Sequence, residues 1–237
     1  MTPRPTRRRA SPRATGLAGL LLAALAGAAG CSNPFLPAQP AVPGGTDQNV
    51  VVSMDFSTPE LLLNTMAAAV SVKNKGNGAA AYLAAFADTA TQNVGAHIEF
   101  DPDVVAERSG AGLSGPPGGW SIAGNEKTFY EYLSTRSAGD FSLTWTDTLT
   151  DDTGDPDRQA FNRRYSVTAV SDDFSEVQYV SQGWARIEMR RVSVPTVRWV
   201  ITRWNDHVLD AQTAPDPSDP GLRCFSRLRI DSYNGVR

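Results

Sequence analysis

The residues of this 237-residue chain whose types and spacing could support acid–base chemistry are scattered along it. Asp101 follows His97 by four residues, so on an extended strand the two side chains would point to the same face. Such a pair could act as general acid and base, although a structural histidine is the simpler interpretation. Asp147 shares the parity of Trp145, and a carboxylate among aromatic rings would have a raised pKa and could act as a base. We favour the alternative, in which Asp147 lies in water at a strand end.

Other catalytic and cofactor signatures are missing or out of context. The two histidines, His97 and His207, have neither HExxH spacing nor a cysteine partner, so we expect no metal site. Residues 110–115 match GxGxxG, but the following Pro-Pro-Gly-Gly forbids the helix that a dinucleotide site requires. We therefore expect no bound cofactor, and we identify no catalytic residue beyond the candidates above.

Five aromatic residues are candidates for lining an apolar pocket. Trp120 follows a Gly/Pro-rich loop, where it could cover a pocket or a partner surface. Packing between helices and sheet explains the phenol of Tyr82 equally well, and for Trp199 it is the better explanation. The full set of candidates is Tyr82, Trp120, Phe129, Trp145 and Trp199.

The N-terminus has the pattern of an export signal. Residues 1–15 are polar and rich in arginine, and residues 16–30 are small and apolar, too few for an ordinary membrane span. The junction Ala-Ala-Gly-Cys, ending at Cys31, resembles the lipobox of bacterial lipoproteins. That resemblance implies cleavage before Cys31 and its lipidation, and Ser32 is compatible with sorting to the outer membrane. The alternative is an ordinary signal peptide in which Cys31 is incidental.

These patterns divide the chain into three parts. We expect a signal peptide at residues 1–30, a Pro/Gly-rich tether at residues 31–56 and one folded domain at residues 57–237. Lipidation of Cys31 would leave Cys224 as a lone thiol, which its apolar neighbours predict to be buried. The lipid would anchor the protein at the periplasmic side of the outer membrane rather than the inner membrane.

The charge of the chain excludes some partners. The net formal charge is −3, but five arginines and no acids precede residue 31, which leaves 17 basic against 25 acidic residues in the mature part. An acidic domain is unsuited to nucleic acid, whose phosphates require lysine and arginine. We expect no nucleic-acid partner.

Hydrophobic periodicity predicts helices first and long strands afterwards, which is typical of an α+β fold. Residues 176–207 give the clearest signal, two long strands joined by a turn near residues 193–195. Helices are expected near residues 57–76, 77–87 and 122–135, and strands at 91–100, 141–149, 161–170 and, as a last edge strand, 222–230.

Three short phrases in this order resemble the nuclear transport factor 2-like superfamily, which includes SnoaL-like and ketosteroid-isomerase-like proteins. They are TPELL at residues 58–62, YLAAFAD at 82–88 and WVITRW at 199–204. The resemblance implies a cone, also described as cystatin-like, in which N-terminal helices pack in a curved, mostly antiparallel sheet. It also implies an apolar pocket at the open end of the cone.

Three functions are compatible with this sequence. The one we favour is a non-catalytic envelope lipoprotein whose domain binds a small apolar ligand or a protein partner. The second is an isomerase- or dehydratase-type enzyme that uses His97, Asp101 or Asp147. The third is a structural envelope module that works as a homodimer. An enclosed pocket with a histidine or carboxylate of perturbed pKa would separate the second function from the first.

Overall fold

A computed structural model describes residues 51–72, 75–136, 140–151, 153–170, 177–209 and 224–236, without the side chains of residues 147, 148 and 177. These residues belong to one compact unit, Val42–Arg237. The expected signal peptide, Cys31 and most of the expected tether lie outside the described residues.

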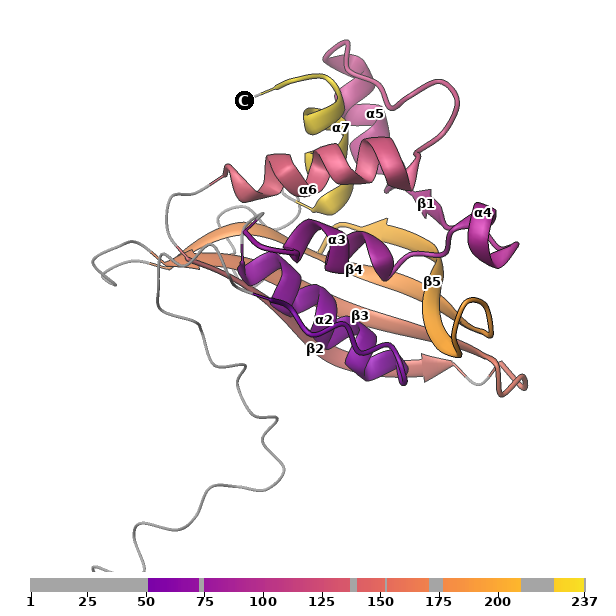
Figure 1. Cartoon of the computed structure of the whole chain (residues 1–237). Helices are drawn as coiled ribbons and strands as arrows, with labels where there is room; N and C mark the ends of the chain where they lie inside the picture. Colours follow the sequence, from indigo (N-terminus) through magenta and orange to yellow (C-terminus); the bar gives the residue numbers. More distant parts are fainter. Residues whose placement is uncertain are drawn as a thin grey trace, which may run out of the picture. The chain divides into compact units, whose positions relative to one another are not determined.

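The described residues form a curved five-stranded sheet of order β1-β5-β4-β3-β2 (Figure 1). The three contacts among the four long strands are antiparallel, and the short β1 runs parallel to β5. The predicted long hairpin is confirmed as β4 and β5. The strands are β1 (His97–Glu99), β2 (Asp140–Asp151), β3 (Arg158–Val170), β4 (Val177–Val192) and β5 (Arg198–His207).

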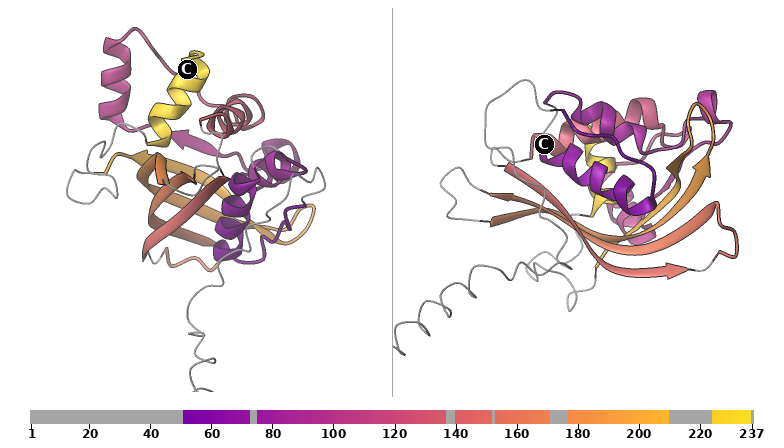
Figure 2. Two further views of the ribbon diagram at one scale, coloured as in Figure 1. Left: turned by 90° about the vertical axis from the view of Figure 1, so that its left-hand side faces the viewer. Right: turned by 60° about the horizontal axis from the view of Figure 1, so that its bottom comes forward.

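The helices gather on one side of this sheet, which curves around them (Figure 2). Most of their buried apolar side chains share one hydrophobic core with the inner face of the long strands, and Val104, Cys224 and Ile230 form a smaller cluster. The predicted α+β class, with helices packed in a curved and mostly antiparallel sheet, is confirmed. The helices are α2 (Pro59–Ser71), α3 (Gly78–Ala84), α4 (Thr89–Gln92), α5 (Pro102–Gly110), α6 (Lys127–Ser134), which continues a π-helical turn η1 (Ile122–Glu126), and α7 (Phe225–Tyr233).

Alternation along β4 separates the two faces of the sheet. Ala185, Ile187 and Met189 are buried in the core, whereas Arg186 and Glu188 point to the opposite face. Because successive side chains of a strand point to opposite faces, this pattern places the charged groups away from the helices.

Helix α2 begins where the sequence predicts. The Thr58 side chain accepts a hydrogen bond from the Leu61 amide, and Pro59 occupies the first turn, where its missing N–H costs nothing. Leu62 and Met66, four residues apart, are fully buried on one face. The cap and the apolar face together fix both the start and the orientation of the helix.

The expected strand at residues 91–100 is largely wrong. Only His97–Glu99 form a strand, and Thr89–Gln92 form the short helix α4. Asp88 caps α4 by accepting the Ala90 amide, and Asn93 ends it in the left-handed conformation. Asn tolerates that conformation better than most residues, so local capping outweighed the weak alternation of the sequence.

The predicted edge strand at residues 222–230 is also wrong, because Phe225–Tyr233 form helix α7. Phe225, Leu228, Arg229 and Ser232 are buried at helical spacing. Helix α5 was not predicted at all, although Asp101 followed by Pro102 repeats the start signal of α2. The predicted burial of Cys224, just before α7, is confirmed, and burial raises the pKa of its thiol well above the ordinary value.

We predict that Thr58→Ala lowers the free energy of unfolding by about 1 kcal/mol, because the Leu61 amide loses its acceptor. Thr58→Ser keeps a hydroxyl at the same place and serves as the control, with most of that stability retained. Urea denaturation of the three proteins measures the difference. Equal losses in both variants would contradict the assigned cap.

Candidate functional site

A buried ion pair joins the helices at the centre of the core. Glu126, at the junction of η1 and α6, and Arg229, on α7, both have side chains with no exposure to solvent. Nε of Arg229 donates to Oε2 of Glu126 at 2.9 Å, and Nη2 donates to Oε1 at 2.7 Å. This two-pronged geometry is the strongest that a guanidinium and a carboxylate can form.

Two aromatic side chains complete the hydrogen bonding of Glu126. The Tyr82 hydroxyl donates to Oε1 at 2.7 Å, and the Trp120 indole Nε1 donates to Oε2 at 2.7 Å. The carboxylate thus accepts four hydrogen bonds, two on each oxygen, which matches its capacity. Burial, and next the charge of Glu126, raises the pKa of Tyr82 well above its ordinary value, so the phenol stays a donor.

Aromatic rings surround the guanidinium of Arg229. Its central carbon lies 4.9 Å from the ring centre of Phe129, 5.2 Å from that of Trp204 and 5.5 Å from that of Phe225. Burial acts to lower the pKa of Arg229, but the Glu126 carboxylate outweighs it, so the net pKa lies above the ordinary value. Nη1 is buried with no hydrogen-bond partner in the described part of the chain, and the guanidinium as a whole is stabilised by the surrounding rings.

A second buried carboxylate, Asp206 on β5, holds the start of α7. It accepts hydrogen bonds from the Tyr165 hydroxyl at 2.7 Å and from the Ser226 amide. The Tyr165 hydroxyl in turn accepts from the Phe225 amide at 2.7 Å. Two otherwise unpaired N–H groups of the first turn are therefore satisfied by side chains of the sheet. Burial raises the pKa of Asp206 above its ordinary value, although Arg229 and the hydrogen bonds oppose this shift.

The structure does not bring the predicted pair His97 and Asp101 together. The imidazole of His97 is mostly exposed and lies 3.9 Å from Glu99. Asp101 is buried, and its Oδ1 caps α5 by accepting the amides of Asp103 and Val104. Its Oδ2 accepts the Val208 amide and lies 3.7 Å from Nδ1 of His207. Asp101 therefore stabilises the start of α5 and the end of β5, and His97 lies at the surface.

Asp147 lies where the pairing of β2 with β3 shifts register between Thr146 and Thr148, and its side chain is outside the described residues. A β-bulge of this kind redirects side chains locally, which parity along the sequence does not reveal.

Of the five aromatic candidates, Tyr82, Phe129 and Trp199 are buried in the main core, and Trp120 and Trp145 are partly buried and pack against it. Three of them, Tyr82, Trp120 and Phe129, contact the Glu126–Arg229 pair. The Trp145 ring centre lies 5.9 Å from that of Trp204, and its Nε1 donates to the Leu63 carbonyl. Trp199 is buried on β5. Their side chains therefore pack against the protein's own groups.

Glu126, Arg229 and Asp206 are not among the residues predicted above, although the sequence carries signals for Glu126 and Asp206. Glu126 lies four residues after Ile122 and three before Phe129, so it falls on the apolar face of its helix. Asp206 shares the parity of the buried Trp204 on β5. A charged residue at an apolar position is the useful signal, because burial then requires a partner.

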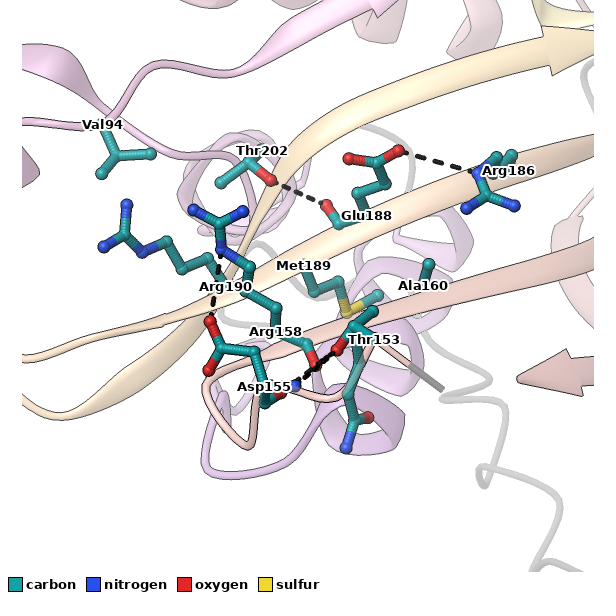
Figure 3. A pocket seen from close by; sticks show the side chains of 11 residues that line it. Val94, Thr153, Asp155, Arg158, Ala160, Arg186, Glu188, Met189, Arg190 and Thr202 are labelled. Carbon is teal, nitrogen blue, oxygen red and sulfur yellow. Dashed lines mark hydrogen bonds and ion pairs between the residues drawn. The ribbon is translucent and has the colours of Figure 1, made fainter. Parts of the chain in front are cut away.

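A hollow of the described surface lies on the other face of the sheet. It is an open groove of about 540 Å³ between β3, β4, β5 and the turn before β3 (Figure 3). We call it the arginine groove, and it is lined by Val94, Thr153, Asp155, Arg158, Gln159, Ala160, Arg186, Glu188, Met189, Arg190 and Thr202.

No three side chains of His, Cys, Asp or Glu in the described ranges lie close enough to hold a metal ion. None of the helices in this part of the chain has the length and apolarity to span a bilayer.

No protein-family profile and no curated protein matches the chain in sequence. Solved structures similar to it include a nuclear transport factor 2-like superfamily protein from Salmonella enterica, with 10% identity, a TM-score of 0.38, and coverage of 61% of this chain and 84% of the other. A variant of a protein of unknown function from Mycobacterium tuberculosis has 12% identity, a TM-score of 0.44 and coverage of 75% and 92%. A provisionally assigned aromatic ring hydroxylase from Novosphingobium aromaticivorans has 18% identity and a TM-score of 0.42, with coverage of 62% of this chain and 83% of the other.

We predict that Glu126→Gln and Arg229→Met each lower the free energy of unfolding by about 3–5 kcal/mol, because each leaves one buried charge without its partner. The double variant should lose at least about 1 kcal/mol less than the sum of the single losses. Urea denaturation of all four proteins completes the cycle.

The matched control is Glu131→Gln on α6, which breaks the exposed 3.9 Å pair with Lys127. It should cost less than about 0.5 kcal/mol. Additive losses at Glu126 and Arg229, or losses no larger than that of the control, would contradict the coupling assigned to the buried pair.

The raised pKa of Asp206 predicts a pH dependence of the free energy of unfolding. This pKa is higher in the folded protein than in the unfolded chain, so the folded state retains the proton more strongly. The contribution of Asp206 to the free energy of unfolding is therefore largest below the ordinary carboxyl pKa and declines as the pH rises through the raised value. Asp206→Asn should remove this decline.

Chemical denaturation between about pH 4 and pH 8 tests this prediction. As the pH rises, Asp206→Asn should gain stability relative to the unmodified protein, whereas the exposed control Asp155→Asn should not. Asp206 is not the group responsible if the difference in the free energy of unfolding between Asp206→Asn and the unmodified protein stays constant with pH. The same conclusion follows if that difference changes in the opposite direction.

Proposed function

We propose that this protein is a lipid-anchored envelope protein whose folded domain is a binding module and not an enzyme. Support for the anchor comes from the sequence, in which the apolar segment at residues 16–30 ends at Cys31. The proline-rich residues that follow suit a tether that holds the domain away from the membrane surface. The outer membrane, on its periplasmic side, is the proposed location.

The observation that carries the binding role is the saturation of Glu126. Its two oxygens already accept four hydrogen bonds, and its charge is matched by Arg229. Asp206 is likewise committed to Tyr165 and Ser226. A general acid or base must be free to exchange a proton with a substrate, and neither buried carboxylate of these two clusters meets that requirement.

The same contacts favour binding at the surface of the domain. Phe225 and Arg229 of α7 occupy the space between the sheet and the other helices, where Phe225 stacks on Tyr165 with ring centres 4.3 Å apart. A small apolar ligand in that space would have to displace these groups, and a homodimer or a protein partner would use outer faces instead. The arginine groove offers an open site that needs no such displacement.

For the anchor, we predict that the protein incorporates labelled palmitate in bacterial cells and sediments with the membrane fraction. Cys31→Ala should abolish the label and release the protein, whereas Cys224→Ala, at the buried thiol, should leave both unchanged. Label that persists in Cys31→Ala would contradict the anchor.

The binding role is tested on the protein isolated from membranes under native conditions, with mass spectrometry of the molecules that accompany it. We expect a bound molecule that is recovered chemically unchanged after prolonged incubation with the protein. Its conversion by the protein would contradict a purely binding role.

A further inference from the structure

The arginine groove brings three guanidinium groups to one side of the sheet (Figure 3). Arg158 on β3 lies directly opposite Arg190 on β4, and Arg186 lies four residues before Arg190, on the same face. Side chains directly opposite on neighbouring strands are about 5 Å apart at their Cβ atoms, so like charges there repel each other. Such an arrangement is stable when nearby anions compensate the charges.

The protein's own acids compensate two of the three arginines. Asp155 lies 3.5 Å from Nε of Arg158, and Asp151 pairs with Arg186. Glu188 also lines the groove, but it is shared between Arg186 at 3.6 Å and Arg203 at 3.9 Å.

Arg190 is different, because its guanidinium has no acidic partner in the described part of the chain. It is exposed, and it lines the same groove as the compensated Arg158 across from it. A planar guanidinium that is not engaged by the protein offers a two-pronged site to a carboxylate or phosphate.

The rest of the groove suits a compact molecule with an apolar part. A volume of about 540 Å³ lies within the range of small-molecule sites. The apolar side chains of Val94 and Ala160 line it beside the charged groups. Ala160 faces away from the core yet is almost fully buried, which places it at the floor of the groove.

We propose that the arginine groove binds a small organic anion, with its carboxylate or phosphate group on Arg190 and its apolar body against Ala160 and Val94. This inference rests on the proposed binding function and adds to it a place and a ligand class. Arg158 and Arg186 stay paired with Asp155 and Asp151, so Arg190 alone of the three engages the anionic group.

Isothermal titration calorimetry of the full-length protein in nanodiscs of neutral lipid tests this site. The probes are benzoate, phenyl phosphate, inorganic phosphate and benzyl alcohol, with empty nanodiscs as the blank. We expect saturable binding of benzoate, of phenyl phosphate or of both, weaker binding of inorganic phosphate, and no binding of benzyl alcohol. The two aromatic anions distinguish a carboxylate site from a phosphate site.

Arg190→Met should weaken binding of the better anion about tenfold or more. Arg190→Lys, which keeps the charge and loses the planar fork, should fall in between. The matched control is Arg191→Met, because Arg191 is also exposed, follows in the same strand, pairs with Asp157 at 3.7 Å and does not line the groove. Its effect should stay within about twofold, and all variants should unfold at the same temperature as the unmodified protein.

Two results would overturn the inference: no saturable binding of either aromatic anion, or an equal loss in Arg190→Met and Arg191→Met, which would indicate a general field and not a site. The proposed function can fail separately. If a molecule accompanies the native lipoprotein and Arg190→Met still retains it, the binding module stands and the groove is not its site. If a bound anion is chemically converted, the groove stands and the non-catalytic role falls.

Discussion

A charge buried in a protein core must be neutralised and hydrogen-bonded, and this requirement governs the centre of the domain. Glu126 and Arg229 meet it together, with Tyr82 and Trp120 supplying the remaining hydrogen bonds. The four residues come from α3, from the segment before η1, from η1 and from α7. One carboxylate therefore fixes the relative positions of segments that lie more than a hundred residues apart in the chain.

Charged groups are used differently in the interior of the domain and at its proposed binding surface. Inside, the buried carboxylates of Glu126 and Asp206 hold α7 in place. On the opposite face of the sheet, guanidinium groups stand in an open groove, and Arg190 has no acid partner among the described residues. Charges in the core thus serve stability, and we propose that Arg190 on the outer face serves binding.

Much of the fold could be predicted from the sequence, because alternation over long strands and a capped helix are local signals. Residues 177–207 show the alternation that predicts the hairpin, and Thr58 with Pro59 is the capping signal that predicts the start of α2. Helix α7 could not be predicted in the same way, since apolar residues at a short spacing fit a strand equally well. The pairing of Glu126 with Arg229, 103 residues later, is set by tertiary packing, and the sequence shows only that each charge lies among apolar neighbours.

Helix α7 is an integral part of the core, held by buried charges. Native-state hydrogen exchange of the Phe225 and Ser226 amides, which donate to Tyr165 and Asp206, is the measurement that bears on this most closely. Both amides should exchange only when the whole domain unfolds, with an opening free energy equal to the global free energy of unfolding. Exchange at a much lower opening free energy, while the amides of β4 stay protected, would contradict it.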